Sequence, residues 1–152
     1  MSTKLSGKTA LITGASAGIG WASALALAGE GANLVLSARR QERLTDLEAA
    51  VQKAGGKAIS LVGDAKEENT ARHAVDLAVK TFGSLDILIN NVGIGNYKNI
   101  IDTSAEDYDE MMDSNVRSTF LFTRYAVPVM IKQGSGTILM ICLLYTSPSP
   151  RD

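Results

Sequence analysis

Residues 13–20 read Thr-Gly-Ala-Ser-Ala-Gly-Ile-Gly, and this glycine loop lies between a short apolar run and a stretch rich in Ala and Leu. A tight turn from a strand into a helix needs backbone without a Cβ clash, which glycine supplies. Bare backbone at the start of a helix also lets a pyrophosphate approach the N–H groups and the positive end of the helix dipole. Gly14, Gly18 and Gly20 meet both requirements. Taken alone, the loop is also consistent with a purely structural turn or with another nucleotide-type ligand.

Short apolar runs alternate with longer amphipathic segments along the whole chain. The runs are rich in Ile, Leu or Val and are continuous rather than alternating in polarity, which is typical of strands covered on both faces. The predicted strands are residues 9–12, 33–36, 58–62, 86–89 and 137–141. Because strands and helices alternate, the pattern predicts right-handed crossovers and a mostly parallel sheet layered with helices.

The predicted helices have recognisable ends. Gly55 and Gly83 each follow a helical segment, which is typical of a helix C-terminus, and Ser104 with Asp107 has the spacing of a capping box. Pro128 predicts a kink or an early end of the last helix. The helical segments are residues 18–28, 41–54, 67–82, a helix that begins after Ser104, and 115–132.

The composition is that of an ordinary globular domain. Of 152 residues, 45% are hydrophobic and 20% charged, so a single domain with a sizeable core is expected. The formal net charge of -1 offers no basic field to nucleic acid or to an anionic membrane. No apolar run approaches the roughly 18 residues that span a bilayer, and the first run is too short for a secretory signal. The single cysteine, Cys142, excludes a disulfide framework and favours the cytoplasm.

The end of the second predicted strand reads Leu-Ser-Ala-Arg-Arg at residues 36–40. An NAD site usually has a carboxylate here that accepts the ribose hydroxyls, and no acid is present at residues 37–40. The guanidinium groups of Arg39 and Arg40 are suited instead to bidentate pairing with a 2′-phosphate. The sequence therefore favours NADP over NAD. The alternative is a solvated pair that faces Glu42 and Asp46.

The fourth predicted strand leads into Asn-Asn-Val-Gly at residues 90–93. With the glycine loop, this motif resembles the short-chain dehydrogenase/reductase family, which pairs TGxxxGxG after the first strand with NNAG after the fourth; Val92 replaces the usual alanine. Asp64 and Asn115 also stand where the family has them, and the resemblance runs through residues 5–141. It implies an α/β fold, a Rossmann-type doubly wound parallel sheet with helices on both faces, truncated after the fifth strand.

The resemblance also implies a cofactor site made from four loops. The pyrophosphate and adenosine ribose would be surrounded by Gly14, Ser16, Gly18, Ile19 and Gly20, and the 2′-phosphate would be bound by Arg39 and Arg40. The adenine would be bordered by Asp64 and Ala65, and the groove floor would be lined by Asn90, Val92 and Gly93. A second interpretation of Asn90 and Asn91 is that they only stabilise the sheet, and the two roles are compatible. No metal site is expected, because no cluster of His, Cys, Asp and Glu has ligand spacing.

Catalysis in this family needs further residues. Asn115 resembles the catalytic asparagine, whose main-chain carbonyl helps hold a water in the proton relay; its alternative role is that of a helix-distorting polar residue. A serine after the fifth strand and the tyrosine and lysine of a YxxxK motif complete the family's set. Here Leu143 stands at the serine position, and Tyr145 is followed four residues later by Ser149 rather than lysine. The chain as written is therefore expected to be inactive.

Residues 142–152 read CLLYTSPSPRD, which resembles a translated sequencing-library adapter. A domain is therefore predicted over residues 1–141, followed by a non-native or disordered tail; the alternative is a genuine divergent tail. Without the further strands and helices that the family has, residues 137–141 are expected to keep uncovered apolar surface that favours aggregation.

The expected function is hydride transfer between NADP(H) and a small-molecule alcohol or carbonyl substrate, by an NADP-dependent short-chain oxidoreductase. The alternative is a non-catalytic dinucleotide-binding module, which the missing serine and YxxxK motif would allow. A methyltransferase with a similar glycine loop is disfavoured, because it would have an acid after the second strand and no reason for the Asn-Asn-Val-Gly motif. The resemblance further implies a homodimer or homotetramer, paired through helices that include the one after Asn115.

Overall fold

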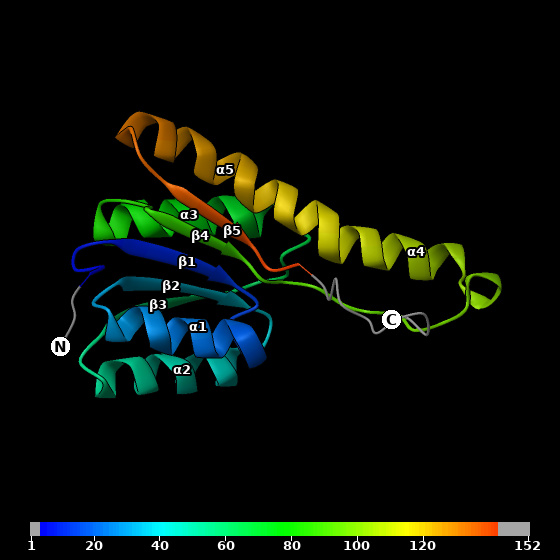
Figure 1. The fold of residues 1–152 in the computed structure, drawn as a ribbon, viewed down its shortest axis with the longest axis horizontal. Coiled ribbons are helices and arrows are strands. Elements are labelled where there is room, and N and C mark those ends of the chain that lie inside the picture. The colour runs from blue at the N-terminus through cyan, green and yellow to red at the C-terminus, as the bar shows by residue number, and fades with distance from the viewer. Residues whose placement is uncertain (1–3, 143–152) are drawn as a thin grey trace, which may run out of the picture.

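Parallel strands form one five-stranded sheet within residues 4–142, the part of the chain that the computed structural model describes. The strands are β1 (Thr9–Thr13), β2 (Asn33–Ala38), β3 (Lys57–Val62), β4 (Ile87–Asn90) and β5 (Thr137–Met140). Their order in the sheet is β3-β2-β1-β4-β5 (Figure 1). The strand order reverses at β1, so the loops after β1 and β4 diverge. An open α/β sheet forms a ligand crevice at such a point, beyond the carboxyl ends of its strands.

Helices cover both faces of this sheet. Figure 1 shows α1 (Gly18–Gly29) and α2 (Gln41–Lys53) on one face, with α3 (Glu68–Phe82) and α5 (Ser118–Gln133) on the other. A short turn, η1 (Ile100–Asp102), precedes α4 (Ala105–Met112), and the π-helical turn η2 (Asp113–Arg117) joins α4 to α5. This arrangement confirms the predicted doubly wound α/β fold.

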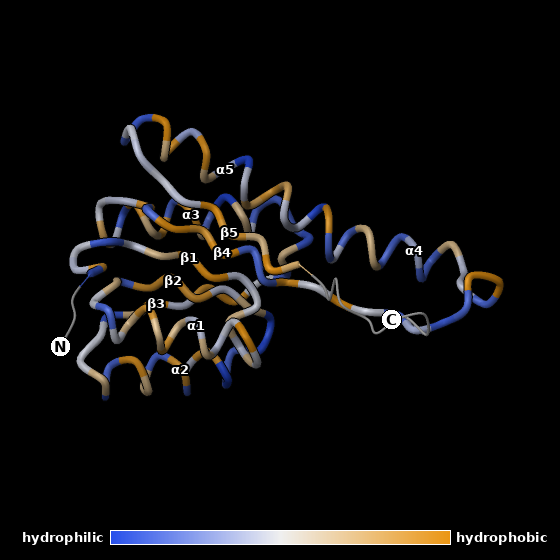
Figure 2. Tube along the Cα trace, in the orientation of Figure 1, coloured by the Kyte–Doolittle hydropathy of each residue, from blue (hydrophilic) through white to orange (hydrophobic). Residues whose placement is uncertain are grey.

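The central strands are buried on both faces, which explains why their apolar runs are continuous. Successive side chains of a strand point to opposite faces of the sheet. Ile12 and Leu34 therefore belong to the core under α1 and α2, whereas Leu11, Val35 and Leu88 belong to the core under α3 and α5. Figure 2 shows these apolar strands at the centre of the molecule. Full burial of each such side chain stabilises the fold by about 1.5–3 kcal/mol.

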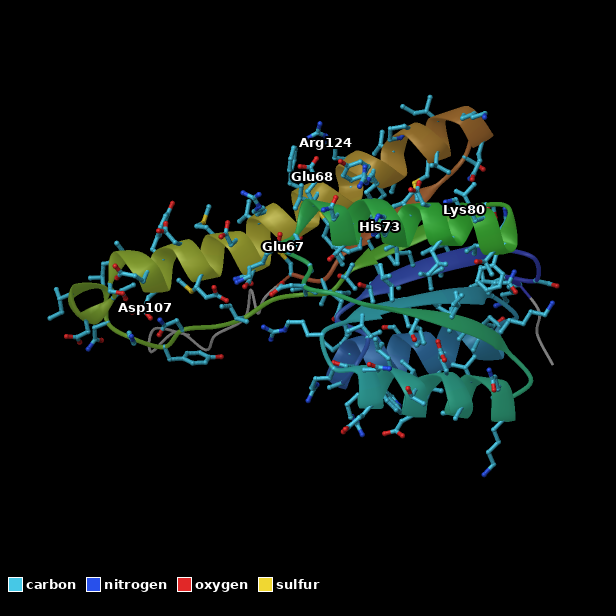
Figure 3. The ribbon with its side chains drawn as sticks, turned by 180° about the vertical axis from the view of Figure 1, so that it is seen from behind. Glu67, Glu68, His73, Lys80, Asp107 and Arg124 are labelled. Atoms are coloured by element: carbon cyan, nitrogen blue, oxygen red, sulfur yellow. The ribbon has the colours of Figure 1, made fainter. Side chains whose placement is uncertain are left out.

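The predicted start of α4 is confirmed in atomic detail. The Ser104 hydroxyl accepts the N–H of Asp107, and the Asp107 carboxylate accepts the N–H of Ser104, both at 3.1 Å. The same carboxylate pairs with the ammonium group of Lys98 at 2.6 Å. These contacts fix the helix end that lies farthest from the sheet (Figure 3).

Of the two alternatives predicted at Pro128, an early end of the last helix is wrong, and a kink stays a prediction. α5 continues through Pro128 to Gln133, and Pro128 is exposed. Ala126 and Met130, on either side of the proline, are buried in the core that α5 shares with α3. Packing of this face offsets the one backbone hydrogen bond that a proline removes.

β5 lies at the edge of the sheet beside β4. Leu139 and Met140 on this strand are 48% and 57% exposed. The expected uncovered apolar surface is therefore present here, and the aggregation that it favours stays a prediction.

Asp86 links the beginnings of three neighbouring strands. One carboxylate oxygen accepts a hydrogen bond from the ammonium group of Lys8 at 2.9 Å. The other accepts hydrogen bonds from the Thr9 N–H at 2.9 Å and from the Ser84 hydroxyl at 2.7 Å. Its own N–H donates to the Thr9 carbonyl, and its carbonyl accepts the Thr137 N–H. Burial alone would raise the pKa of this carboxyl, but the hydrogen bonds from Lys8, Ser84 and Thr9 outweigh it and lower the pKa below its usual 3.8.

We expect Asp86→Asn to reduce the free energy of unfolding by about 1.5–3 kcal/mol at pH 7, the range for hydrogen bonds to charged groups. Because the folded pKa lies below the unfolded pKa, the carboxylate stabilises the fold fully above the unfolded value, and this contribution is lost as pH falls through the folded pKa. Urea unfolding of both proteins at several pH values measures this. The difference should shrink below about pH 4; a difference that is constant with pH would contradict the assignment.

Candidate cofactor site

A cleft of about 360 Å³ opens at the carboxyl ends of the strands. The loops that follow β1, β2, β3 and β4 all contribute to its walls. Of the predicted site residues, those that line it are Gly14, Ser16, Gly18, Arg39, Arg40, Asp64, Ala65, Val92 and Gly93. Ile19, Gly20, Asn90 and Asn115 are not among the lining residues. Segments far apart in the sequence thus meet at the crevice that the strand order creates.

Two glycines of the loop adopt backbone conformations that other residues rarely take. Gly14 has φ 64° and Gly18 has φ 55°, both in the left-handed region. Gly20 is required for a different reason, since a Cβ there would lie 2.6 Å from both the Asn91 amide nitrogen and the Gly14 carbonyl oxygen. Gly20 therefore contributes to the cleft through close packing behind the loop, which is why it does not line the wall.

Asn91 holds the glycine loop in place. Its Nδ2 donates to the carbonyls of Thr13 at 3.1 Å and Gly14 at 3.2 Å. Its main-chain N–H donates to the Thr13 hydroxyl at 2.9 Å, and that hydroxyl donates to the Ile89 carbonyl at 3.4 Å. The ends of β1 and β4 are thereby joined directly below the cleft. The cofactor-site prediction omitted Asn91, although the doubled asparagine at residues 90 and 91 was a usable signal.

Both arginines after β2 are exposed at the cleft wall. An Arg40 guanidinium nitrogen donates to the hydroxyl of Ser16 in the glycine loop at 3.0 Å. Within residues 4–142 neither Arg39 nor Arg40 forms an ion pair. Asp46, the alternative partner considered from the sequence, lies 3.7 Å from Arg43 instead. Arg39 and Arg40 thus place two positive charges at the cleft wall, where Asp64 is the one acidic side chain among the described lining residues.

The N-terminus of α1 faces the same loop with few competing groups. Its N-cap, Ala17, makes no side-chain hydrogen bond to the helix, and the first turn holds no acid. The first N–H groups of a helix and its dipole attract anions. This end of α1 is thus suited to a phosphate group.

The loop after β3 supplies one polar and one apolar side chain. Asp64 accepts the N–H of Lys66 at 3.1 Å, which fixes the turn into α3, and Ala65 is buried. Both line the cleft, whereas Ile19 on α1 is 59% exposed outside it.

Asn90 is directed to the sheet and α5. Its Nδ2 donates to the Thr123 hydroxyl at 3.2 Å, and its carbonyl accepts the Ile141 N–H at 2.9 Å. The buried Oδ1 has no hydrogen-bond partner among the described residues. These contacts agree with the second interpretation of Asn90, as a residue that stabilises the sheet.

Asn115 lies on the π-helical turn, and its side chain forms hydrogen bonds with the loop after β4. Its Oδ1 accepts the Ile94 N–H at 2.7 Å, and its Nδ2 donates to the Ile94 carbonyl at 2.9 Å. Its main-chain carbonyl accepts the Thr119 hydroxyl at 3.0 Å. Ile94 lines the cleft, so Asn115 acts on its wall from behind. Sequence reasoning anticipated a role for the carbonyl but missed this side-chain clamp; π-helical turns are frequent at functional sites.

Other titratable groups lie away from the cleft. His73 is exposed on α3 (Figure 3). At the start of α3, the Glu68 carboxylate accepts a hydrogen bond from the Tyr125 hydroxyl at 2.6 Å and lies 3.6 Å from the Arg124 guanidinium. These contacts join α3 to α5. The Tyr125 hydrogen bond lowers the pKa of Glu68.

The described residues, 4–142, hold no candidate metal site and no candidate membrane-spanning helix. No group of three His, Cys, Asp or Glu in this range could hold a metal ion. Across the same range, every helix is too short or too polar to cross a lipid bilayer. The sequence positions compared with the catalytic serine, tyrosine and lysine, Leu143, Tyr145 and Ser149, lie outside the described residues.

The fold and the cleft define a Rossmann-type α/β protein. The sequence profile of the short chain dehydrogenase family matches residues 8–147, and the chain belongs to this family. An uncharacterized oxidoreductase from Thermotoga maritima is 42% identical over 135 residues, which cover 89% of this chain and 53% of that protein.

Solved structures agree with the family assignment. A short-chain type dehydrogenase/reductase from Mycobacterium marinum has a TM-score of 0.86 and 36% identity, covering 92% of this chain and 59% of that one. A 7α-hydroxysteroid dehydrogenase, solved with NADH and 7-oxo glycochenodeoxycholic acid, has a TM-score of 0.86 and 36% identity, covering 90% of this chain and 53% of that one. The chain spans about half the length of these relatives.

We expect Gly20→Ala to lower the free energy of unfolding by about 1–3 kcal/mol, since the added methyl must displace backbone or Asn91. Gly29→Ala, at the other end of α1, is the matched control, because nothing lies within 4 Å of its Cβ position. Alanine there should be neutral or stabilise by up to about 1 kcal/mol. Urea unfolding of both variants measures this, and equal stability of the two would show that the Gly20 contact is unimportant.

Proposed function

We propose that this chain binds NADP(H) in the cleft, and that the protein of which it is part transfers a hydride between NADP(H) and a small-molecule alcohol or carbonyl compound. The observation that carries the proposal is the position of Arg39 and Arg40 at a glycine-lined cleft, without an acidic partner in residues 4–142. A dianionic 2′-phosphate would supply the missing counter-charge.

The remaining cleft supports a dinucleotide of this kind. The uncapped N-terminus of α1 and the left-handed Gly14 and Gly18 suit the pyrophosphate. Ser16, in the same loop, accepts a hydrogen bond from Arg40. Asp64 and Ala65 are available to the adenine, and Val92 and Gly93 continue the wall toward the nicotinamide end. We assign Ile19, Gly20 and Asn90 supporting roles outside the wall.

The preference for NADP rests on this chain's own residues. The similar 7α-hydroxysteroid dehydrogenase was solved with NADH, so membership of the family does not decide between the cofactors. One charge-assisted hydrogen bond contributes about 1.5–3 kcal/mol, which corresponds to roughly ten- to hundredfold in affinity. The absence of an acid at residues 37–40 removes the usual partner of an unmodified ribose.

For the reaction, the described residues contribute binding and positioning. NADP(H), when bound, supplies or accepts the hydride. Asn115 fixes Ile94 at the cleft wall, and we propose that its carbonyl takes part in the proton relay of the complete enzyme. The sequence contains no YxxxK motif, so the proton donor of the family is not provided by this chain.

We further propose that residues 1–141 form the cofactor-binding domain and that residues 142–152 are not native to it. The proposal rests on the likeness of the last eleven residues to an adapter, although the family match extends to residue 147.

For the complete protein, we also propose a cytoplasmic location and a homodimer or homotetramer. Exposed apolar side chains along α4, η2 and α5, among them Tyr108, Val116 and Phe120, support such pairing.

A non-catalytic dinucleotide-binding module is the second candidate, favoured by the absence of YxxxK. The two candidates differ in the gene downstream of codon 141. Sequencing the source DNA should reveal a serine codon after β5 and a YxxxK motif beyond it. An intact reading frame without them would leave only the module.

We expect Arg39→Gln/Arg40→Gln to weaken NADPH binding by at least roughly ten- to hundredfold, the loss that removal of a single charge-assisted contact to the 2′-phosphate would cause. NADH binding should change by less than about threefold, since NADH lacks that phosphate. Titrations followed by nucleotide fluorescence measure both constants. Arg72→Gln/Lys80→Gln removes the same charge from exposed positions on α3 and is the control. Equal affinity of the unmodified chain for NADPH and NADH would refute the proposed preference.

A further inference from the structure

Arg43, which the cofactor-site prediction did not include, contacts the glycine loop. It lies in the first turn of α2, and its Nε donates to the Ser16 carbonyl at 3.4 Å. Its guanidinium lies over the Trp21 ring, 4.8 Å from the centroid. A guanidinium nitrogen also lies 3.7 Å from the Asp46 carboxylate, although both side chains are about half exposed, at 47% and 63%. Arg43 thus joins α2 to the loop and to the first turn of α1.

The guanidinium groups of Arg40 and Arg43 both donate hydrogen bonds to Ser16. Arg40 donates to its hydroxyl at 3.0 Å, and Arg43 donates to its carbonyl at 3.4 Å. Ser16 is itself buried, with 8% of its surface exposed, so it offers a fixed acceptor to both. Arg43 thus holds the backbone of the residue whose hydroxyl Arg40 binds.

The stack on Trp21 restricts where Arg43 can go. A guanidinium over an indole ring is held by about 0.5–1 kcal/mol at exposed sites, and the ring packs against the buried core under α1 and α2. Arg43 does not line the cleft. It lines a neighbouring pocket together with Arg40, and Ser16, which both arginines bind, connects it to the cleft wall.

We propose that Arg43, stacked on Trp21, is a positioning residue for 2′-phosphate recognition: it fixes Ser16, and Ser16 fixes Arg40. The proposal rests on the proposed binding of NADP(H) in the same cleft. It adds Arg43 and Trp21 to the residues that determine which cofactor the cleft prefers. A purely structural tie between α2 and the loop would affect NADPH and NADH alike. If Arg43 positions the 2′-phosphate contact, its loss changes the ratio of the NADPH and NADH dissociation constants.

The test measures NADPH and NADH dissociation constants for the full 152-residue chain by nucleotide fluorescence. Arg43→Gln should lower the NADPH-to-NADH preference by roughly three- to tenfold, chiefly through NADPH, because the Arg40 contact is loosened rather than removed. Trp21→Leu should lower it in the same direction. Thermal unfolding of each variant, recorded alongside, establishes that it is folded.

Arg124→Gln is the matched control. Arg124 also lies over an aromatic ring, that of Tyr125 at 5.8 Å, and beside a carboxylate, that of Glu68 at 3.6 Å, but on α5 away from the cleft. Its substitution should leave the preference unchanged.

A double substitution separates positioning from direct contact. In an Arg40→Gln background, Arg43→Gln should have no further effect on the preference, because the residue through which it acts is gone. Additive losses would overturn the proposal, as would an unchanged preference in Arg43→Gln or an equal loss of both cofactors. If the unmodified chain itself shows no preference for NADPH, the proposed function fails instead, which is a distinguishable result.

Discussion

The hydrogen bonds from Asn91 to the carbonyls of Thr13 and Gly14 are the contact on which the cleft depends. They join the ends of β1 and β4, two strands that lie side by side although 73 residues separate the end of one from the start of the other. They require Gly20, because any Cβ there would occupy the space of the amide and of the Gly14 carbonyl. The glycine loop is therefore shaped by tertiary contact as much as by its own backbone freedom.

Charge at the cleft mouth follows from the same arrangement. The end of β2 lies beside the glycine loop because β2 pairs with β1 in register, with Ser37 opposite Thr13. The chain then places Arg39 and Arg40 at the wall, and the start of α2 brings Arg43 to the other side of Ser16. Arg40 and Arg43 both bind the buried Ser16, and Arg39 lines the same cleft. Within residues 4–142 the one ion pair formed by these three arginines is that of Arg43 with Asp46. An anionic ligand fits this imbalance.

Much of the fold could be predicted from sequence, because its signals are local. Continuous apolar runs placed all five strands within two residues of their bounds, and the Ser104–Asp107 capping box was read correctly. An early helix end at Pro128, one of the two alternatives predicted there, was wrong because the packing of Ala126 and Met130 is a tertiary effect. The clamp of Asn115 on Ile94 and the stack of Arg43 on Trp21 were not predictable for the same reason: each joins elements whose separation is known only once the sheet is assembled.

The central claim is that a phosphorylated dinucleotide lies across the glycine loop and the end of β2. Hydrogen–deuterium exchange of the full chain, with and without saturating NADPH, tests it most directly. The account predicts slower exchange on binding in residues 13–20, 37–40 and 63–65, with little change in α4 and α5. Unchanged exchange in the first two of these segments, at a concentration where binding is detected, would contradict it.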